Sequence, residues 1–325
     1  MKAEILAALR ASDGYVSGQE LCGKFGVSRT AIWKAINQLK QAGYEIEAVQ
    51  NRGYHIVSTP DILSENELRS IRKTEWLGNR IYYEAEIDST NTKAMKRAEE
   101  GAPHGTIVVT DHQKNGRGRR GRTWESPAGE AIAMTFLLRP KIDPNNASML
   151  TLIAAMAVAR GIEDETGLKA GIKWPNDVII NRKKVSGILT EMSAQADYVN
   201  HIVVGIGINV HIDEFPEELK NIATSIFLEL GIKINRAALI ERICEYFEAY
   251  FEVFLQTEDL SAISKQYDAY MVNRNQPVKV LDPKDTYEGT ARGITTRGEL
   301  LVDTWESRKL VSSGEVSVRG IYGYL

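Results

Sequence analysis

The sequence has 325 residues, of which 43% are hydrophobic and 26% are charged, and its net charge is −3. This length allows two or three domains that each bury a core, and the charge excludes a polycation that binds nucleic acid along its whole length. The longest apolar run, near residues 149–159, is too short for the ~20 residues that cross a bilayer, and the charged, amphipathic N-terminus is not a signal peptide. We therefore expect a cytoplasmic protein with no membrane partner.

Residues 1–60 have the pattern of a winged helix-turn-helix. A short apolar helix near residues 5–9 precedes a helix that begins after Ser17, in a capping-box pattern, and ends at Phe25. Ser28 would cap a third helix, in which Ile32, Ile36 and Leu39 recur at helical spacing. Residues 45–49 and 54–57 then predict a two-stranded wing.

Charge points to one basic face on this N-terminal segment. Residues 1–60 carry seven Lys and Arg against five Asp and Glu, and the stretch between Glu20 and Glu45 holds four bases and no acid. The third helix would present polar side chains opposite its apolar stripe, where a recognition helix meets DNA bases. The candidate DNA-binding residues are Arg29, Thr30, Lys34 and Asn37. The alternative for this segment is a small three-helix dimerisation domain.

The rest of the chain mixes antiparallel hairpins with helices, which favours an α+β fold over a doubly wound sheet. Strands are expected at 81–87, 106–110, 131–138, 178–191 (a hairpin) and 201–209, with helices at 91–100, 145–166, 236–255 and 260–273. From residue 276 short strands at 277–281, 287–294, 299–303 and 316–319 predict a small SH3-like barrel. The predicted domains are 1–60, 61–274 and 275–325.

A glycine- and arginine-rich stretch, residues 116–122 followed by Thr123 and Trp124, predicts an anion-binding loop. Its glycines allow close approach of the backbone to a ligand, and its four arginines can bind phosphate or carboxylate oxygens. The spacing matches neither the P-loop nor the dinucleotide-binding fingerprint. On composition alone, a solvated basic loop or a nucleic-acid-binding arm is an equally good interpretation.

A second motif decides between these interpretations. Lys173-Trp174-Pro175-Asn176-Asp177 precedes an apolar strand and a polar turn, and the return strand begins with Lys184 and continues through Gly187. The loop, this motif and the return strand together resemble the biotin–protein ligases. The resemblance extends to Ser89-Thr90-Asn91 and to residues 205–209, so it covers roughly residues 80–325. With the N-terminal segment, the whole chain resembles the bifunctional biotin ligases that also repress a biotin operon.

The resemblance implies a central domain with a mixed sheet like that of class II aminoacyl-tRNA synthetases, and a set of site residues. Biotin is implied to contact Ser89, Thr90, Asn91, Gln113, Gly116, Arg117, Gly118, Arg119, Lys184 and Gly187. The adenylate is implied to contact Arg119, Arg122, Trp124, Asn176 and Asn209. The catalytic candidates are Arg119, Arg122, Lys184 and Asp177. Several of these residues have a purely structural alternative: a helix N-cap for residues 89–91, a turn for Asp177 and a core position for Trp124.

Two features of the implied site stay open in the sequence. Lys183 and Lys184 are adjacent, so on a regular strand only one faces the site, and periodicity does not choose between them. Alignment with the family chooses Lys184. The loop 210–234 contains no tryptophan, so no residue for stacking on adenine is evident.

The resemblance implies ATP, with Mg²⁺ accompanying it, as cosubstrate and biotin as substrate, and the sequence offers no metal-binding cluster; its two cysteines, Cys22 and Cys244, are far apart. The implied partners are operator DNA, bound as a homodimer, and a biotin carboxyl carrier domain of a carboxylase. The alternatives are a ligand-sensing repressor with a catalytically weak ligase-like domain, and a lipoate ligase.

Overall fold

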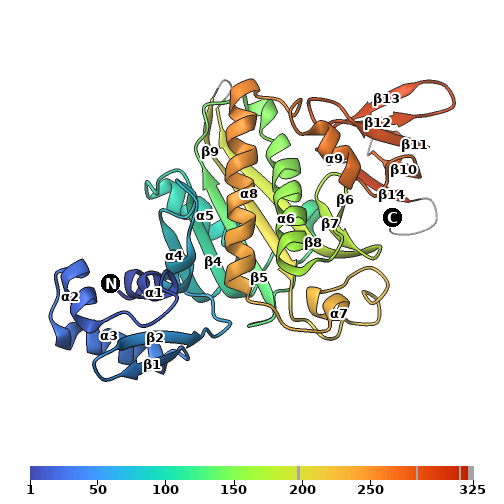
Figure 1. Cartoon of the computed structure of the whole chain (residues 1–325). Helices are drawn as coiled ribbons and strands as arrows, with labels where there is room; N and C mark the ends of the chain where they lie inside the picture. The colour runs from blue at the N-terminus through green and yellow to red at the C-terminus, as the bar shows by residue number, and fades with distance from the viewer. Residues whose placement is uncertain (196–197, 283–284, 315, 321–325) are drawn as a thin grey trace.

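The computed structural model describes residues 1–325 except 196–197, 283–284, 315 and 321–325. A small helical domain, a central sheet covered by helices and a second, smaller sheet follow one another along the chain, and the N-terminal domain and the C-terminal sheet lie at opposite ends of the molecule (Figure 1). In the described ranges, we find no helix with the length and apolar character needed to span a membrane.

The N-terminal part is a winged helix-turn-helix, as expected. Ser17 and Ser28 cap the second and third helices, since their hydroxyls accept hydrogen bonds from the backbone N–H groups of Glu20 (3.0 Å) and Ala31 (3.2 Å). Its core is built from Ile32, Ile36, Leu39 and their neighbours. The elements are α1 (Lys2–Arg10), α2 (Gly18–Phe25), α3 (Arg29–Gln41) and the antiparallel wing of β1 (Glu45–Val49) and β2 (Gly53–Ser58).

The central part contains a seven-stranded mixed sheet with the order β3-β4-β5-β9-β8-β7-β6. The β3–β4 pair is parallel, and the other neighbouring pairs in this order are antiparallel. The strands are β3 (Ile81–Ile87), β4 (Thr106–Gln113), β5 (Ala131–Leu138), β6 (Gly171–Lys173), β7 (Asp177–Ile180), β8 (Lys183–Ala194) and β9 (Val199–Asn209).

Helices cover both faces of this sheet. On one face, α6 (Met149–Thr166) and α8 (Arg236–Thr257) pack against the main core, and both lie across the front of the sheet in Figure 1. On the other face, α5 (Thr90–Glu99) packs on Val108, Leu137 and Val203, which alternate with the residues of the main core along their strands. The expected α+β plan is therefore confirmed.

Several element limits differ from those expected. The helix expected at 145–166 begins at Met149, because residues 144–146 form a separate 3₁₀ turn after Asp143. The helix expected at 260–273 is confined to α9 (Ser264–Tyr270). Two short helices were not expected: α4 (Glu65–Ile71), capped by Ser64, and α7 (Ile226–Leu230), capped by Ser225.

The C-terminal part is a five-stranded antiparallel sheet with the order β13-β12-β11-β10-β14, in keeping with the small barrel expected. One strand, β13, had not been expected, since its residues Arg308–Val311 alternate too weakly to predict it. The strands are β10 (Pro277–Leu281), β11 (Thr286–Ile294), β12 (Leu300–Asp303), β13 (Arg308–Val311) and β14 (Ser317–Gly320).

The N-terminal domain is docked on the central part by a buried charge. Both carboxylate oxygens of Glu67 on α4 accept hydrogen bonds from Arg10 of α1, at 2.7 and 2.9 Å, and the Tyr44 hydroxyl donates to Glu67 at 2.6 Å. Glu67 is only 1% exposed. Such a charge is stable in the interior because it is paired and hydrogen-bonded. The two parts therefore share a specific interface in addition to the linker.

Candidate functional site

A cavity of about 850 Å³ opens over the β9–β8–β7–β6 side of the sheet, where residues 205–207 of β9 line it together with five further groups of residues. They are the start of α5 with the end of β4, the loop 117–124, the β6–β7–β8 hairpins, the loop 219–222 and the start of β14. The sequence-predicted residues among its lining are Ser89, Thr90, Asn91, Gln113, Arg117, Gly118, Arg119, Arg122, Trp124, Asn176, Asp177, Lys184 and Gly187.

A small polar pocket lies at the junction of α5 and β4. The side-chain oxygen of Gln113 accepts hydrogen bonds from the Thr90 backbone N–H (2.9 Å) and the Thr90 hydroxyl (3.1 Å), and its amide nitrogen donates to Ser126 (3.3 Å). These contacts fix the orientation of the Gln113 amide. A buried amide and hydroxyls suit a neutral ligand group that both donates and accepts, such as a ureido ring.

Asn91 lines the same pocket but has structural partners for its side chain. Its oxygen accepts from the Thr135 hydroxyl (2.7 Å), and its nitrogen donates to the Leu189 carbonyl (3.2 Å) and to Glu191 (2.7 Å). It therefore ties the start of α5 to β5 and β8. Gly205 faces it, and a Cβ there would lie 2.2 Å from the Asn91 oxygen.

Glycines on paired strands form the floor of the cavity. Gly187 of β8 is the register partner of Gly207 of β9, and the Trp124 indole covers both. A Cβ at Gly207 would lie 2.4 Å from the indole nitrogen, so only glycine permits this contact. That nitrogen is buried and has no hydrogen-bond partner among the described residues. The floor can accept a flat ring system beside or in place of the indole.

Basic side chains surround the other end of the cavity. The Lys184 amine lies 2.5 Å from Asp177 and 5.3 Å from the centre of the Trp124 ring. Lys173 is 6% exposed, and its burial lowers the pKa to about 8, against the opposing effect of Asp177. Burial likewise lowers the pKa of Arg119. Partly desolvated cations are suited to anionic oxygens, because their attraction is stronger than it would be in water.

The loop 116–124 is folded back on itself like a hairpin. The Trp124 N–H donates to the Gly116 carbonyl (2.9 Å), and the Gly118 N–H donates to the Arg122 carbonyl (2.7 Å). Gly116 approaches the backbone of Trp124 so closely that a Cβ would lie 2.2 Å from its carbonyl oxygen. Three of the four arginines, Arg117, Arg120 and Arg122, are exposed.

The fourth arginine of this loop is anchored. Arg119 donates to the side-chain oxygen of Asn176 at 3.1 Å and to three backbone carbonyls near the start of β14, those of Ser313, Gly314 and Val316. It thus connects the loop to the hairpin motif and to the C-terminal sheet. Asn176 is held in turn by the Ile188 carbonyl, to which it donates at 3.2 Å.

Two of the expected site residues do not line the cavity that the described residues form. Asn209 donates to the Thr224 carbonyl (3.0 Å), and Gly116 is enclosed by Trp124 and Gln113; among the described residues, both fall outside the cavity lining. Their proposed ligand contacts stay predictions. The structure also brings in residues that had no assigned role: Lys173, the loop 219–222, and Arg319 of β14.

Of these additions, Lys173 had a signal in the sequence, since it begins the motif 173–177. Arg319 had none, because it comes from another domain. The loop 219–222 is placed by β8: the Lys184 N–H donates to the Ile222 carbonyl (2.7 Å), and the Lys184 carbonyl accepts from Thr224 (2.9 Å).

The candidate DNA-binding surface is the outer face of α3. Arg29, Thr30 and Lys34 are exposed, whereas Asn37 is half-buried. Arg29 donates to Gln19 of α2 at 2.8 Å, which fixes it at the start of the helix. Trp33, to which no role had been assigned, is 56% exposed on the same helix. An aromatic ring in that position is available for apolar contact with DNA.

Within the described residues, no group of three or more His, Cys, Asp or Glu side chains could hold a metal ion. A fold and cavity of this kind, with a helix-turn-helix at one end, define a protein ligase of the biotin and lipoate type joined to a DNA-binding domain. Family models agree with each part: a helix-turn-helix domain matches residues 2–55, the biotin/lipoate A/B protein ligase family matches 83–209, and the biotin protein ligase C-terminal domain matches 275–319.

Individual relatives match nearly the full length of the chain. The bifunctional ligase/repressor BirA of Bacillus spizizenii is 42% identical over 311 residues, which are 95% of each chain. The protein of the same name from Escherichia coli is 30% identical over 97% of this chain and 96% of its own. The chain therefore belongs to the bifunctional ligase/repressor family, as its sequence motifs had indicated.

Solved structures agree for the ligase and C-terminal parts. The biotin protein ligase from Aquifex aeolicus in complex with biotin and ATP superposes with a TM-score of 0.66 at 31% identity, over 74% of this chain and 99% of that one. Together with the helix-turn-helix match at residues 2–55, this likeness confirms the fold expected from the sequence in all three of its parts.

Proposed function

We propose that this protein is an ATP-dependent biotin–protein ligase and that the product of its first step, biotinyl-5′-AMP, makes it a repressor of biotin synthesis genes. The observation that carries the ligase proposal is the cavity that joins the Gln113 pocket, the glycine floor and the cluster of Arg119, Lys184 and Lys173. A neutral ring pocket next to a cationic region matches a substrate with a ureido ring and a carboxylate that reacts with ATP.

In the first step, an oxygen of the biotin carboxylate attacks the α-phosphorus of ATP. The bond from that phosphorus to the bridging oxygen breaks, and pyrophosphate leaves with its electron pair. Negative charge on the phosphate oxygens must be neutralised, and we assign this role to Arg119, Arg122 and Lys184. Mg²⁺ would enter on the phosphate oxygens of ATP and keep several water ligands.

In the second step, the amine of an acceptor lysine attacks the acyl carbon of the adenylate, an amide forms, and AMP leaves. The amine must lose a proton, and Asp177 lies beside Lys184 at the place where it could accept that proton or orient the amine. The loop 116–124 would cover the adenylate and exclude water, which limits hydrolysis of this reactive anhydride.

The acceptor is proposed to be a biotin carboxyl carrier domain, and the second ligand is operator DNA. The repressor proposal is supported by the exposed basic face of α3 and by the wing β1–β2 beside it. Because one winged helix reads few bases, we propose binding as a homodimer to two half-sites. ATP, carboxylases and chromosomal DNA meet in the cytoplasm, where we place the protein. We also propose the domain limits 1–60, 61–274 and 275–325.

Biotin-dependent exchange of labelled pyrophosphate into ATP tests the first step. We expect exchange with biotin and much weaker exchange with lipoate, because the Gln113 pocket is polar on several sides. Exchange that prefers lipoate would make the chain a lipoate ligase. Operator binding without any exchange would indicate a sensor with a catalytically weak ligase domain.

A further inference from the structure

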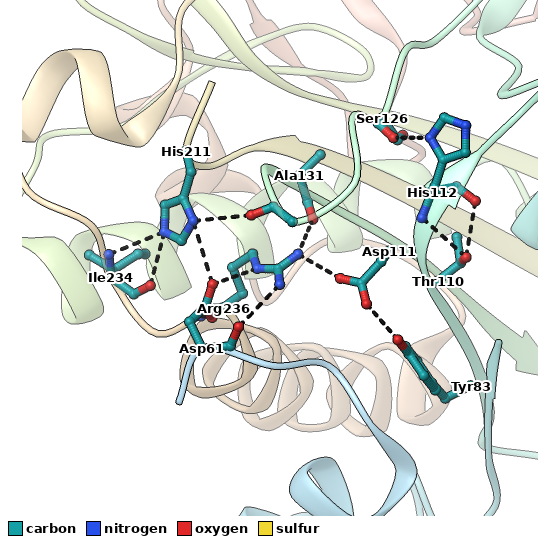
Figure 2. Close-up of polar contacts among 11 residues, drawn as sticks. Asp61, Tyr83, Thr110, Asp111, His112, Ser126, Ala131, His211, Ile234 and Arg236 are labelled. Atoms are coloured by element: carbon teal, nitrogen blue, oxygen red, sulfur yellow. Dashed lines mark hydrogen bonds and ion pairs between the residues drawn. The ribbon is translucent and has the colours of Figure 1, made fainter. Parts of the chain in front are cut away.

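A buried arginine outside the proposed ligand cavity connects three parts of the molecule. Arg236, at the start of α8, is 2% exposed. Its guanidinium binds Asp61 through Nε (2.8 Å) and binds both Asp111 (2.9 Å) and the Ala131 carbonyl (3.1 Å) through one terminal nitrogen. Figure 2 shows this side chain between its three partners. Nothing in the proposed ligand chemistry uses it.

Two of these partners flank the ligand-binding loop. Asp111 lies near the end of β4 and Ala131 begins β5, so the chain between them contains the anion-binding loop and Trp124. Asp111 is further fixed by the Tyr83 hydroxyl, which donates to it at 2.5 Å. Gln113 of the ring pocket follows Asp111 by two positions. One terminal nitrogen of Arg236 thus holds both ends of the segment that would close over the ligand.

A histidine contacts the C-terminal end of the loop, next to Ala131. One His211 ring nitrogen lies 3.3 Å from the Gly129 carbonyl oxygen and 3.5 Å from Asp61, and the other lies 3.0 Å from the Ile234 carbonyl oxygen. The Val210 and His211 N–H groups both donate to the Glu130 carbonyl, at 3.1 and 2.7 Å. The loop end, α8 and Asp61 therefore form one contact network (Figure 2).

The third partner, Asp61, directly follows the linker from the DNA-binding domain. It accepts a second hydrogen bond from the Arg236 backbone N–H at 2.8 Å, so it also satisfies the first N–H group of α8, next to the N-cap residue of that helix. The DNA-binding domain is thereby fixed at two places, Asp61 on Arg236 and Arg10 on Glu67. Arg236 therefore joins the base of the ligand loop to the residue that follows the linker, and His211 contacts the same two regions beside it.

We infer that Arg236 is a positioning residue shared by the ligand loop and the DNA-binding domain, through which a ligand bound under residues 112–130 changes the affinity for operator DNA. This inference rests on the proposed function, because it needs an adenylate-dependent repressor. It requires that the contacts of Arg236 with Asp61 and with Asp111 transmit the effect in series, so that loss of either contact interrupts it. By linkage, the path must work in both directions: DNA raises the affinity for the adenylate by the factor by which the adenylate raises the affinity for DNA.

The test uses isosteric variants of the full chain, because removing Arg236 would leave two carboxylates unpaired and endanger folding. The variants are Asp61→Asn, Asp111→Asn and the double variant, and Glu65→Gln on α4 is the matched control, an exposed carboxylate near the same junction that does not touch Arg236. The DNA fragment is one that the wild-type protein selects from a random library in the presence of biotinyl-AMP. Each variant is titrated against this fragment with and without biotinyl-AMP. The measured quantity is the ratio of the two dissociation constants.

We expect the wild-type ratio to lie in the range of about 5- to 150-fold found for coupled sites. Each single variant should lower that ratio several-fold, towards the part contributed by any ligand-dependent change in dimer population, and the double variant should lower it no further, because both changes interrupt one path. Asp61→Asn should keep its pyrophosphate exchange, whereas Asp111→Asn should raise the KM for biotin more than it lowers kcat. Glu65→Gln should behave as the wild type.

A purely structural role for these carboxylates would weaken DNA binding equally in both ligand states and leave the ratio unchanged, and that result would overturn the inference. Additive losses in the double variant would overturn it as well. If biotinyl-AMP has no effect on DNA binding by the wild-type protein, the proposed corepressor role fails and the inference falls with it. If the variants keep the wild-type ratio of dissociation constants, the inference about Arg236 fails while the proposed corepressor role stands.

Discussion

At the scale of single residues, the two adjacent lysines of β8 differ in what they contact. Lys184 pairs with Asp177 and lies over Trp124, inside the region of the cavity that carries the cations. We expect Lys184→Ala to slow adenylation by about 10²–10³-fold, the effect of removing one charge-assisted contact to a developing charge, roughly 3–4 kcal/mol. Lys183→Ala is the matched control, and pyrophosphate exchange is the measurement. A larger decrease in Lys183→Ala would transfer the role to that residue.

The strand explains why periodicity could not choose between these lysines. Lys184 pairs with Ile179 and Ser186 with Val178, so Val185 is an extra residue, and the hairpin register shifts there. Alternation of faces is interrupted at the bulge, and both lysines line the cavity. The motif spacing identified the right segment, whereas the direction of each side chain depended on a local irregularity that leaves no mark in composition.

The lowered pKa of Lys173 predicts that ATP binding weakens and that the free energy of unfolding increases as the pH rises. Its pKa is lowered from 10.5 to about 8 by burial, so the folded protein loses this cation as the pH rises through about 8. If the cation attracts the phosphates of ATP, the KM for ATP should rise by roughly tenfold between about pH 7 and pH 9.5, as expected from about 1.4 kcal/mol. Lys173→Arg should flatten this dependence, because arginine stays charged.

The stability of the folded protein should increase as the pH rises above about 8. Between pH 8 and 10.5 the unfolded chain binds the proton that folded Lys173 has released, so the free energy of unfolding rises with pH. Urea titrations of the wild type and of Lys173→Met would show this as a rise that the variant lacks. A KM for ATP with the same pH profile in the wild type and in Lys173→Arg would contradict the proposed contact with phosphate.

At the scale of elements, the anion-binding loop is attached unevenly. Arg119 is held by four contacts to Asn176 and the β14 region, while Arg117, Arg120 and Arg122 are exposed. Three glycines and few apolar contacts give such a loop low local stability without a ligand. We therefore expect trypsin to cut the ligand-free protein at the exposed arginines and to cut much more slowly with biotinyl-AMP, as followed by mass spectrometry. Equal rates in both states would show that the ligand does not order this loop.

Sequence patterns predicted those elements that have strong periodicity or a clear cap. The capped helices α2 and α3 and the buried strands β5 and β9 are of this kind. The short helix α4 was missed, although Ser64 caps it, because it has too few residues to establish a period. The start of α6 was misplaced because Pro144 begins a separate turn four residues upstream of Ser148.

At the scale of the molecule, the order of the three parts was predictable, but the contacts between them were not. Arg10 and Glu67 are 57 positions apart, and Asp61 and Arg236 are 175 apart. No local pattern connects such pairs, and the linker at residues 58–60 showed no sign that the DNA-binding domain would be docked by buried charges. The sequence did not predict that Arg319 lines the cavity for the same reason, because Arg319 belongs to the C-terminal sheet.

This docking decides how the proposed dimer should be tested. Deleting residues 1–60 would remove Arg10 and Tyr44, the partners of Glu67, and would expose the surface of α4 on which α1 packs, so the deletion changes more than DNA binding. Substitutions on the exposed face of α3 avoid that problem. We expect Arg29→Ala with Lys34→Ala to weaken operator binding and to lower the dependence of its logarithm on salt by about 0.9 for each DNA phosphate that the variant no longer neutralises.

The same double variant should still dimerise when biotinyl-AMP is added, because we place the dimer contact in the central domain beside the ligand loops. Those loops would be ordered by the adenylate and would complete the contact, so a larger fraction of dimer would raise DNA affinity by mass action. Sedimentation velocity of the wild type and the variant, with and without biotinyl-AMP, measures this directly. The dimer fraction should rise equally in both proteins. If the adenylate leaves both proteins monomeric, the ligand must act through the orientation of the DNA-binding domain, for which the Asp61–Arg236 contact is the available connection.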